Sequence, residues 1–533
     1  MITKITEMNK KHLALLLLVV LGCTGAIILW INTSIWGIGV GYDSYFYLSA
    51  ADNFLAGNGF SRYGGDGIPI PIVHFPPAYP LILAATNYIF PGDAIFGARI
   101  LAVILLGLNI VIIGWLIYTF TESVLASLLG TVTALLSPFL LEVHLMAMTE
   151  PIFLATTLLM LYVLSKHVQN PTMKTLTIAS ILAGISFLIR YAGATSFVVG
   201  VVAILVFGST KISQKIKNVS YFVLISLLVI SPWLIRNWVL TRSITNRSAV
   251  FHFPGIDKLL EGINVAATWI SPTLITEDLV SSNLAILKLS LVVAAIILGI
   301  IIWVIKLRRA PEKLVIENHG IRFVAISSIY IGIYILFLFV SLALFDASIQ
   351  LSNRILSPIY VITLTLGIIA VWQGYSIKSS RILTVAGIIG AVLFLSRANF
   401  DRYQFDLDNM RESGKVFTGR EWQNSETINV IHSLPSELNI FTNEPFAVYI
   451  LTGRITSSIP EKYNPVKREA NSTFEAQMEL MMGVFRSGNG ALILFDSYNR
   501  PGVYASEAQI TRSLILWRDT ADGSVYIPEG FEP

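Results

Sequence analysis

The chain has 533 residues, of which 54% are apolar and only 13% are charged, whereas an average soluble domain carries roughly 25% charged residues. This composition excludes an ordinary soluble protein and indicates a polytopic α-helical membrane protein. The formal net charge is only +4 and no long basic run is present, so we expect membrane lipids as partners and no nucleic acid.

The first apolar stretch covers residues 13–31 and follows three lysines. Its length is sufficient to cross a bilayer, and no small-residue cleavage site follows it, so we predict a retained anchor rather than a signal peptide. The single cysteine, Cys23, lies within this stretch. An intramolecular disulfide is therefore excluded.

Ten further apolar stretches follow, which gives about eleven predicted membrane helices. They lie near residues 13–31, 97–119, 122–141, 150–166, 174–191, 193–209, 218–238, 283–305, 323–345, 355–375 and 382–397.

The lysines and arginines between these helices predict the orientation of the chain. With a cytoplasmic N-terminus, the inner loops contain Lys166, Lys174, Lys211, Lys215, Lys217, Lys306, Arg308, Arg309, Lys313, Arg322, Lys378 and Arg381. This bias follows the positive-inside rule and predicts a multi-pass protein of the cell membrane.

Three segments then face outward, residues 32–96, 239–282 and 398–533. We expect a transmembrane domain over residues 1–397, which includes the first outer loop, and an extracytoplasmic domain over residues 398–533. In the second domain, residues 438–443 and 491–495 have the pattern of short buried strands, and residues 445–451 and 472–486 have helical patterns. These patterns predict a small α/β domain.

Ionisable residues gather at the predicted outer helix ends, where charge is costly and usually functional. They are Asp43, Arg99, Glu142, His144, Glu150, Arg190, Arg236 and Arg354. The positive-inside rule depletes arginine from this side, and guanidinium groups bind phosphate in a bidentate manner. The outward arginines therefore suggest recognition of a phosphorylated lipid.

Simpler structural roles compete with these functional ones. Asp43 fits the N-cap of a helix over residues 44–56 that Gly57 would end, and a capping role does not exclude a chemical one. Asp52 lies about 180° away around that helix, so we expect it to be solvated. Arg190 also fits a snorkelling residue.

The ring side chains of the first loop favour an anchor at the membrane interface over a stacking surface for sugar. These residues are Tyr42, Tyr45, Phe46 and Tyr47. His144 and Glu142 together offer two metal ligands, fewer than the usual three or four. A divalent metal is therefore left open, and no cofactor is assigned.

Several motifs, taken in order, resemble the GT-C superfamily of membrane glycosyltransferases. They are DSYFYLSAADNFLAGNGF, HFPPAYPLILA, GARILAV, SPFLLEVHLMAMTEPIFLA, PWLIRNW and NRILSPIY, within roughly residues 10–400. The similarity is greatest to the dolichyl-phosphate-mannose:protein mannosyltransferase-like and lipid A aminoarabinose transferase-like branches. A WWDYG-like motif is absent from the sequence, which argues against an oligosaccharyltransferase catalytic subunit.

This resemblance implies transfer of a sugar from a polyprenyl-phosphate donor to a hydroxyl of a lipid, protein or glycan acceptor on the outer face. Asp43 would match the catalytic base of an inverting displacement, and Glu150 or Glu142 would match the second acidic position. Arg354 and Arg236 would hold the donor phosphate.

Other outer-face residues are secondary candidates for the same site. Arg99 and Arg190 are further candidates for the donor phosphate. His144, His74 and Tyr79 are candidates for contact with substrate or metal, although His74 and Tyr79 match a segment that packs beneath the first loop.

Two other classes of protein share some of these features. A transporter or flippase of lipid-linked saccharides would also have many helices and outward arginines, and a non-catalytic envelope assembly protein would use mainly its C-terminal domain. Transporters usually place polar residues near the bilayer midplane within repeated halves. Here the acidic residues lie at the outer ends and no repeat is visible, which favours the transferase.

Overall fold

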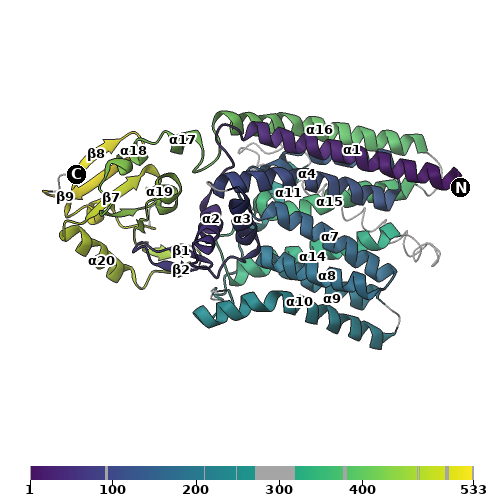
Figure 1. Cartoon of the computed structure of the whole chain (residues 1–533), viewed down its shortest axis with the longest axis horizontal. Helices are drawn as coiled ribbons and strands as arrows, with labels where there is room; N and C mark the ends of the chain where they lie inside the picture. The colour runs from purple at the N-terminus through teal and green to yellow at the C-terminus, as the bar shows by residue number, and fades with distance from the viewer. Residues whose placement is uncertain are drawn as a thin grey trace.

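Long apolar helices lie side by side and form a bundle from most of the chain. The C-terminal sheet lies beyond one end of this bundle (Figure 1). The computed structural model describes residues 2–90, 94–208, 211–245, 247, 249–269, 319–375, 381–464, 466, 468–498 and 503–530. The helices of the bundle are α1 (Ile2–Asn32), α4 (Ala94–Thr121), α5 (Val124–Leu135), α6 (Pro138–His144), α7 (Glu150–Gln169), α8 (Met173–Ile189), α9 (Ala194–Phe207), α10 (Ile212–Thr241), α14 (His319–Leu344), α15 (Asn353–Tyr375) and α16 (Arg381–Glu412).

Within the described ranges, six helices are long and apolar enough to cross a membrane, or seven if the bent pair α5 and α6 is one span. Large apolar side chains on α1 and α10, such as Leu16 and Leu228, are exposed as expected of a lipid-facing surface. These findings confirm a polytopic helical membrane protein. The helix predicted near residues 283–305 lies outside the described residues.

Two predicted spans differ in shape from the expectation. The stretch at 122–141 is broken by a bend of 57° between α5 and α6, because Ser137 caps a new helix through its side chain and Pro138 occupies the first turn of that helix. The helix predicted at 382–397 is longer than expected, since α16 continues to Glu412.

A smaller layer lies between the bundle and the C-terminal sheet (Figure 1). It contains α2 (Tyr42–Leu55), α3 (Ala78–Ile89) and the antiparallel pair β1 (Ser61–Tyr63) and β2 (Pro69–Pro71), all from the first outer loop. A further helix, α11 (Ile256–Thr268), comes from the second outer segment.

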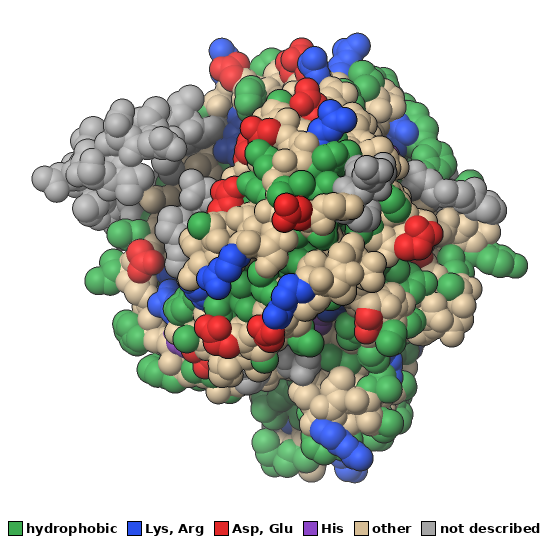
Figure 2. Space-filling view, turned by 90° about the vertical axis from the view of Figure 1, so that its left-hand side faces the viewer, with side chains coloured by type: hydrophobic (Ala, Val, Ile, Leu, Met, Phe, Trp, Pro, Cys, Tyr) green, Lys and Arg blue, Asp and Glu red, His purple; other side chains and the backbone are tan. Residues whose placement is uncertain are grey.

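The C-terminal part contains a five-stranded sheet in the order β4–β3–β7–β9–β8. β3 is parallel to β4 and β7, whereas β9 is antiparallel to β7 and β8. The elements are α17 (Arg420–Gln423), α18 (Glu426–Ser433), β3 (Asn439–Thr442), α19 (Pro445–Thr452), β4 (Ser457–Ser458), β5 (Tyr463–Asn464), β6 (Glu469–Ala470), α20 (Phe474–Arg486), β7 (Gly490–Phe495), α21 (Glu507–Ile510), β8 (Leu514–Thr520) and β9 (Gly523–Pro528). The predicted strands and helices of this part correspond to β3, β7, α19 and α20. Acidic and basic side chains are scattered over this end of the molecule (Figure 2).

Two glycines allow α1 and α4 to pack at backbone distance. A Cβ atom at Gly107 would lie 2.9 Å from the carbonyl oxygen of Gly22, and a Cβ atom at Gly22 would lie 2.7 Å from that of Gly107. Small residues at such crossings are typical of membrane helices, because packing replaces the hydrophobic effect as the source of association. The first two long spans therefore depend on glycine at this crossing.

We expect Gly107→Val to destabilise the protein by about 1–3 kcal/mol, because the added side chain must separate the two backbones. The matched control is Gly332→Val in α14, since a Cβ atom at Gly332 would meet no other described atom within 4 Å. Thermal unfolding in detergent, followed by circular dichroism, would measure both. Equal midpoints for the two variants would contradict the proposed role of the glycine crossing.

Candidate active site

Three distant segments of the chain are joined by backbone hydrogen bonds next to the start of α2. The Gly39 amide donates to the Leu145 carbonyl at 3.0 Å, and the Ala147 amide donates to the Gly39 carbonyl at 2.8 Å. The Phe417 amide donates to the Val40 carbonyl at 3.0 Å. This junction holds the first outer loop, the acidic turn before α7 and the C-terminal part in one arrangement.

Glycine is required at the centre of that junction. A Cβ atom at Gly39 would lie 2.9 Å from Cβ of Lys415 and 3.0 Å from the Leu145 carbonyl oxygen. Any larger residue would push these segments apart. The junction therefore sets the distance between Asp43, four residues later, and the turn that leads to Glu150.

Four charged side chains meet beside this junction. Arg354 forms ion pairs with both Asp43 and Glu150. Arg190 pairs with the same oxygen of Glu150 and donates to the Thr149 hydroxyl at 2.9 Å. The structure thus brings together two carboxylates and two guanidinium groups that the sequence had placed on the outer face.

The helix ends explain why these charges can be held here. Glu150 is the first residue of α7, Asp43 lies in the first turn of α2, and Arg190 is the C-cap of α8. Each of these charges is favoured by its helix dipole, usually by about 0.3–1 kcal/mol. Arg354 is the exception, because it lies in the first turn of α15 where a cation is disfavoured. Its two carboxylate partners compensate for that position.

The cluster has a buried side and an accessible side. The Glu150 side chain is 2% exposed and that of Arg190 is 15% exposed, whereas the side chains of Asp43 and Arg354 are 30% and 33% exposed. A buried carboxylate without a partner is very costly, so Glu150 is held by two guanidinium groups. Asp43 and Arg354 are the members that an incoming substrate can reach.

Asp43 and Asp52, the two aspartates of α2, differ in their surroundings from what we expected. The N-cap of α2 is Gly41 rather than Asp43, which lies two residues further along, so the predicted capping role is wrong. Asp52 does not join the cluster, in agreement with the prediction that it faces away from Asp43 around the helix. It is half-buried and accepts a hydrogen bond from the Asn87 amide at 3.2 Å, so it is not the freely solvated residue that we expected.

Glu142 belongs to a neighbouring group rather than to the cluster. It accepts hydrogen bonds from the Asn353 amide at 3.2 Å and from the Arg402 guanidinium at 3.4 Å. Arg402 was missed by sequence reasoning because the last span was expected to end at residue 397. The spacing of Arg402 and Asp406, which face each other across one turn at 3.8 Å, is the signal that the helix continues.

Two of the predicted phosphate ligands have other partners. Arg99 donates to the Thr33 hydroxyl at 2.9 Å and the Trp30 carbonyl at 2.7 Å, and its guanidinium lies 3.8 Å from the centroid of the Trp30 ring. Arg236 donates to the carbonyls of Ile72 and Phe60 at 2.9 and 2.8 Å. Both arginines therefore fasten the first outer loop to helices and stand apart from the charged cluster.

The other candidate residues are mainly structural. His144 is fully buried, with one ring nitrogen 3.0 Å from the Asn109 amide and the other 2.7 Å from the Leu140 carbonyl. Tyr79 is buried beneath Tyr47, with ring centroids 5.3 Å apart. In the parts of the chain that the structure describes, no group of three or more His, Cys, Asp or Glu residues could hold a metal ion.

His74 packs against a ring of α2. Its half-buried ring packs edge-on against Phe46 at 5.0 Å. Burial, with a smaller contribution from the charges of Arg247 and Arg62, lowers the pKa of His74 to about 4. The imidazole is therefore neutral at neutral pH and adds no positive charge beside Asp43.

The rings of the first loop do not form a membrane anchor, so that prediction is wrong. Tyr45 and Tyr47 are buried, and Tyr45 stacks on Phe446 of α19 with centroids 4.5 Å apart. Tyr42 donates to Glu444 at 2.8 Å. The rings instead fasten α2 to the C-terminal part.

Comparison with known proteins finds a family model that matches part of this chain and solved structures of similar fold. Residues 74–236 match the family model described as dolichyl-phosphate-mannose-protein mannosyltransferase. No curated protein sequence matches the chain. The family match includes the Glu150 turn and the C-cap Arg190.

Three solved structures show the likeness of the fold. ArnT from Cupriavidus metallidurans, bound to undecaprenyl phosphate, superposes with a TM-score of 0.59 at 11% identity over 95% of this chain and 97% of its own. The oligosaccharyltransferase AglB from Archaeoglobus fulgidus, in complex with an inhibitory peptide and a dolichol-phosphate, gives 0.52 at 13% identity over 91% and 70%. The arabinofuranosyltransferase AftD from Mycobacteria gives 0.56 at 11% identity over 97% and 40%.

The family match and the shared architecture together show that this chain has the fold of the GT-C superfamily of membrane glycosyltransferases, as the resemblance in its sequence indicated.

Proposed function

We propose that this chain is a membrane glycosyltransferase that moves a sugar from a polyprenyl-phosphate donor to an acceptor hydroxyl on the outer face. The observation that carries the proposal is the placement of Arg354 between Asp43 and Glu150, with Asp43 and Arg354 on the accessible side. A carboxylate that can accept a proton thus stands next to a cation that can bind phosphate.

The donor class is supported by the neighbours and by the charge of the site. ArnT is seen with undecaprenyl phosphate and AglB with a dolichol-phosphate. A phosphate group matches the fork of a guanidinium, and Arg354 is the arginine of the cluster that is both accessible and adjacent to Asp43. Arg190 is directed at Glu150 and keeps that buried carboxylate in place.

The proposed reaction is a single displacement at the anomeric carbon of the donor. The acceptor oxygen forms the new bond as its proton passes to Asp43, and the bond from the anomeric carbon to the phosphate oxygen breaks. The configuration at that carbon is inverted. The leaving phosphate gains negative charge as the bond breaks, so Arg354 stabilises the transition state more than the bound donor.

The structure adds a condition to this scheme, because Asp43 is already paired with Arg354. A donor phosphate competes with Asp43 for the same guanidinium. When phosphate takes that place, the Asp43 carboxylate loses its cation and gains an anionic neighbour, and both changes make it a better proton acceptor. Donor binding would thereby prepare the base.

The proposed orientation places this cluster outside the cytoplasm. The N-terminus lies at the end of the bundle opposite the C-terminal sheet (Figure 1). The basic residues Lys166, Lys174, Lys211 and Arg322 flank helix ends, and Arg322 donates to the Val168 carbonyl at 2.8 Å. By the positive-inside rule, this basic end is cytoplasmic and the charged cluster is extracytoplasmic.

Replacing the base should remove transfer. We expect Asp43→Asn to lower the rate of sugar transfer by about 10²- to 10⁴-fold, the usual contribution of a general base. The matched control is Asp52→Asn on the same helix, which should keep the wild-type rate. Single-turnover transfer from a polyprenyl-phosphate sugar, measured by mass spectrometry in proteoliposomes, separates the two.

If the protein were a transporter, that assay would give a different result. It would produce no transferred product in the wild type and would leave the Asp43→Asn variant indistinguishable from it. Undiminished transfer by Asp43→Asn would likewise overturn the assignment of the base.

The competition for Arg354 predicts opposite effects of two substitutions on donor binding. Arg354→Gln should weaken binding of undecaprenyl phosphate by about tenfold or more, since a hydrogen bond to a charged group contributes about 1.5–3 kcal/mol. Asp43→Asn should bind it more tightly than the wild type, because the competing carboxylate is gone. Titration calorimetry in detergent micelles gives both affinities.

Arg397→Gln serves as the control, because Arg397 is exposed and pairs only with Asp401 one turn along α16 among the described residues. Its affinity for undecaprenyl phosphate should equal that of the wild type. Weaker binding by Asp43→Asn would show that Asp43 helps to hold the donor and does not compete with it.

A further inference from the structure

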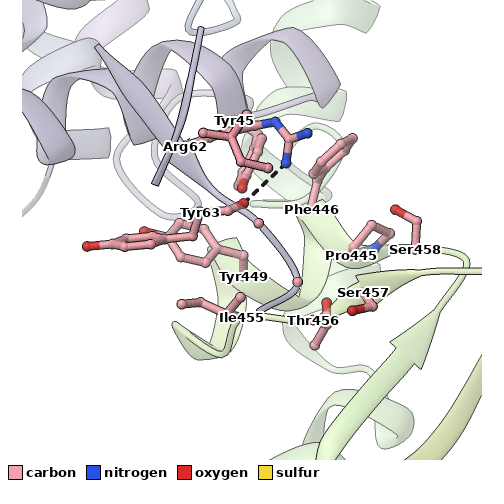
Figure 3. Close-up of a pocket in the computed structure, with 13 residues that line it drawn as sticks. Tyr45, Arg62, Tyr63, Pro445, Phe446, Tyr449, Ile455, Thr456, Ser457 and Ser458 are labelled. Atoms are coloured by element: carbon pink, nitrogen blue, oxygen red, sulfur yellow. Dashed lines mark hydrogen bonds between the residues drawn. The ribbon is translucent and has the colours of Figure 1, made fainter. Parts of the chain in front are cut away.

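A pocket opens between the first outer loop and the C-terminal part (Figure 3). Its volume is about 200 Å³. One wall comes from α2 and the β1–β2 hairpin, and the other comes from α19 and the segment that leads into β4. The two walls are far apart in the sequence, so the pocket exists only when the C-terminal part is docked.

Aromatic rings form the floor of this pocket. Tyr45 stacks on Phe446 with a centroid separation of 4.5 Å and meets Tyr449 edge-on at 5.3 Å. Tyr63 adds a further ring from the hairpin (Figure 3). Rings of this kind present flat apolar faces beside polar hydroxyls, which suits a ligand that is itself apolar on one face and polar at its edges.

The pocket also holds a cation without a carboxylate partner. Arg62 is half-buried, and its guanidinium donates to the Tyr63 carbonyl at 3.2 Å. Among the described residues no Asp or Glu lies within ion-pair distance of it, in contrast to Arg190, Arg354 and Arg402. Its guanidinium lies over the Phe46 ring, 5.8 Å from the ring centroid, and no described carboxylate competes with an incoming acidic group for it.

Hydroxyl side chains complete the lining of the pocket. Thr456, Ser457 and Ser458 form one stretch of its wall. The Thr456 hydroxyl oxygen is shielded from solvent, whereas Ser457 is half-buried and Ser458 is exposed. Serine hydroxyls, a cation and aromatic rings thus line one cavity.

We infer that this pocket binds a saccharide unit of the acceptor that carries an acidic group, a conclusion that rests on the proposed function. The sugar ring would pack its C–H face on Tyr63 and Tyr449, which are half-buried, and its hydroxyls would bond with Ser457 and Ser458. Its acidic group would pair with Arg62. The rings and hydroxyls favour a saccharide over an acidic peptide, because a flat ring with a polar rim matches them better than an extended backbone does.

The position of the pocket on α2 determines which acceptor unit it holds. Tyr45 follows Asp43 by two residues, which is about 200° around the helix. The saccharide in the pocket is therefore not the unit whose hydroxyl reacts, but a neighbouring unit on the same acceptor. Binding it positions the reactive hydroxyl at Asp43, as remote binding energy does in many enzymes.

The test measures binding without turnover, so that it does not depend on catalysis. A disaccharide that ends in glucuronic acid is titrated into the full-length protein in nanodiscs, beside the neutral disaccharide with glucose in the same place. We expect the acidic disaccharide to bind more tightly, and Arg62→Gln to weaken its binding by about tenfold, as for a lost charge-assisted hydrogen bond. Tyr449→Ala should weaken both disaccharides.

Controls separate this site from the catalytic one and from unfolding. Arg512→Gln removes an exposed arginine of the same C-terminal part and should bind as the wild type does. Undiminished transfer by Asp43→Asn would mark failure of the proposed function, whereas unchanged disaccharide binding by Arg62→Gln would mark failure of this inference, so the two failures are distinguishable. In a transfer assay Arg62→Gln should raise the KM for an acidic acceptor and leave the KM for the donor unchanged.

Three outcomes would overturn the inference. They are equal binding of the acidic and neutral disaccharides, equal affinities of Arg62→Gln and Arg512→Gln, and tighter binding of tetraglutamate than of the acidic disaccharide. The last result would assign the pocket to an acidic peptide instead.

Discussion

The shared ion pair of Arg354 with Asp43 and Glu150 is the interaction on which the rest of the site depends. A guanidinium in the first turn of a helix is opposed by the helix dipole, and a buried carboxylate such as Glu150 is costly without a partner. Each charge therefore requires the others. The backbone junction at Gly39 brings their helices close enough for the pairing, so the cluster and the architecture around it form together.

The same interaction links the structure to the proposed chemistry. In the proposed reaction, the lipid phosphate approaches the accessible side of Arg354, where Asp43 lies. A phosphate that binds the Arg354 nitrogen now paired with Asp43 would release that carboxylate. The buried Glu150–Arg190 pair would stay in place during this proposed exchange and keep the charge of Arg354 partly balanced. This gives the buried carboxylate a positioning role that does not need it to touch substrate.

Much of this arrangement could be predicted from the sequence, and the failures have physical causes. The polytopic helical class, the meeting of Asp43, Glu150, Arg190 and Arg354, and two strands of the C-terminal sheet were all expected from hydropathy and charge pattern. The sequence alone does not decide between Glu142 and Glu150 as the second acidic residue. Both flank the same turn, and only the packing of the helices directs one of them to Arg354.

Arginine roles were harder to predict, because a guanidinium serves equally well for phosphate or for backbone carbonyls. Arg99 and Arg236 satisfy carbonyls and hydroxyls of the first outer loop, and nothing in their local sequence separates them from Arg354. Arg62 was missed for the opposite reason. It lies in a polar loop whose sequence gives no sign of function. The pocket that suggests a function forms only when the fold brings Phe446 and Tyr449 next to Arg62.

Helix α2 connects these two observations. One side of it carries Asp43 toward the membrane bundle, and another carries Tyr45 toward α19. A short helix that is fixed on both sides cannot turn to improve one contact without losing the other. The C-terminal part therefore does more than cover the site, since the rings that hold it in place also determine the direction in which Asp43 points. Docking of that part and the geometry of the proposed base are in this way a single structural property.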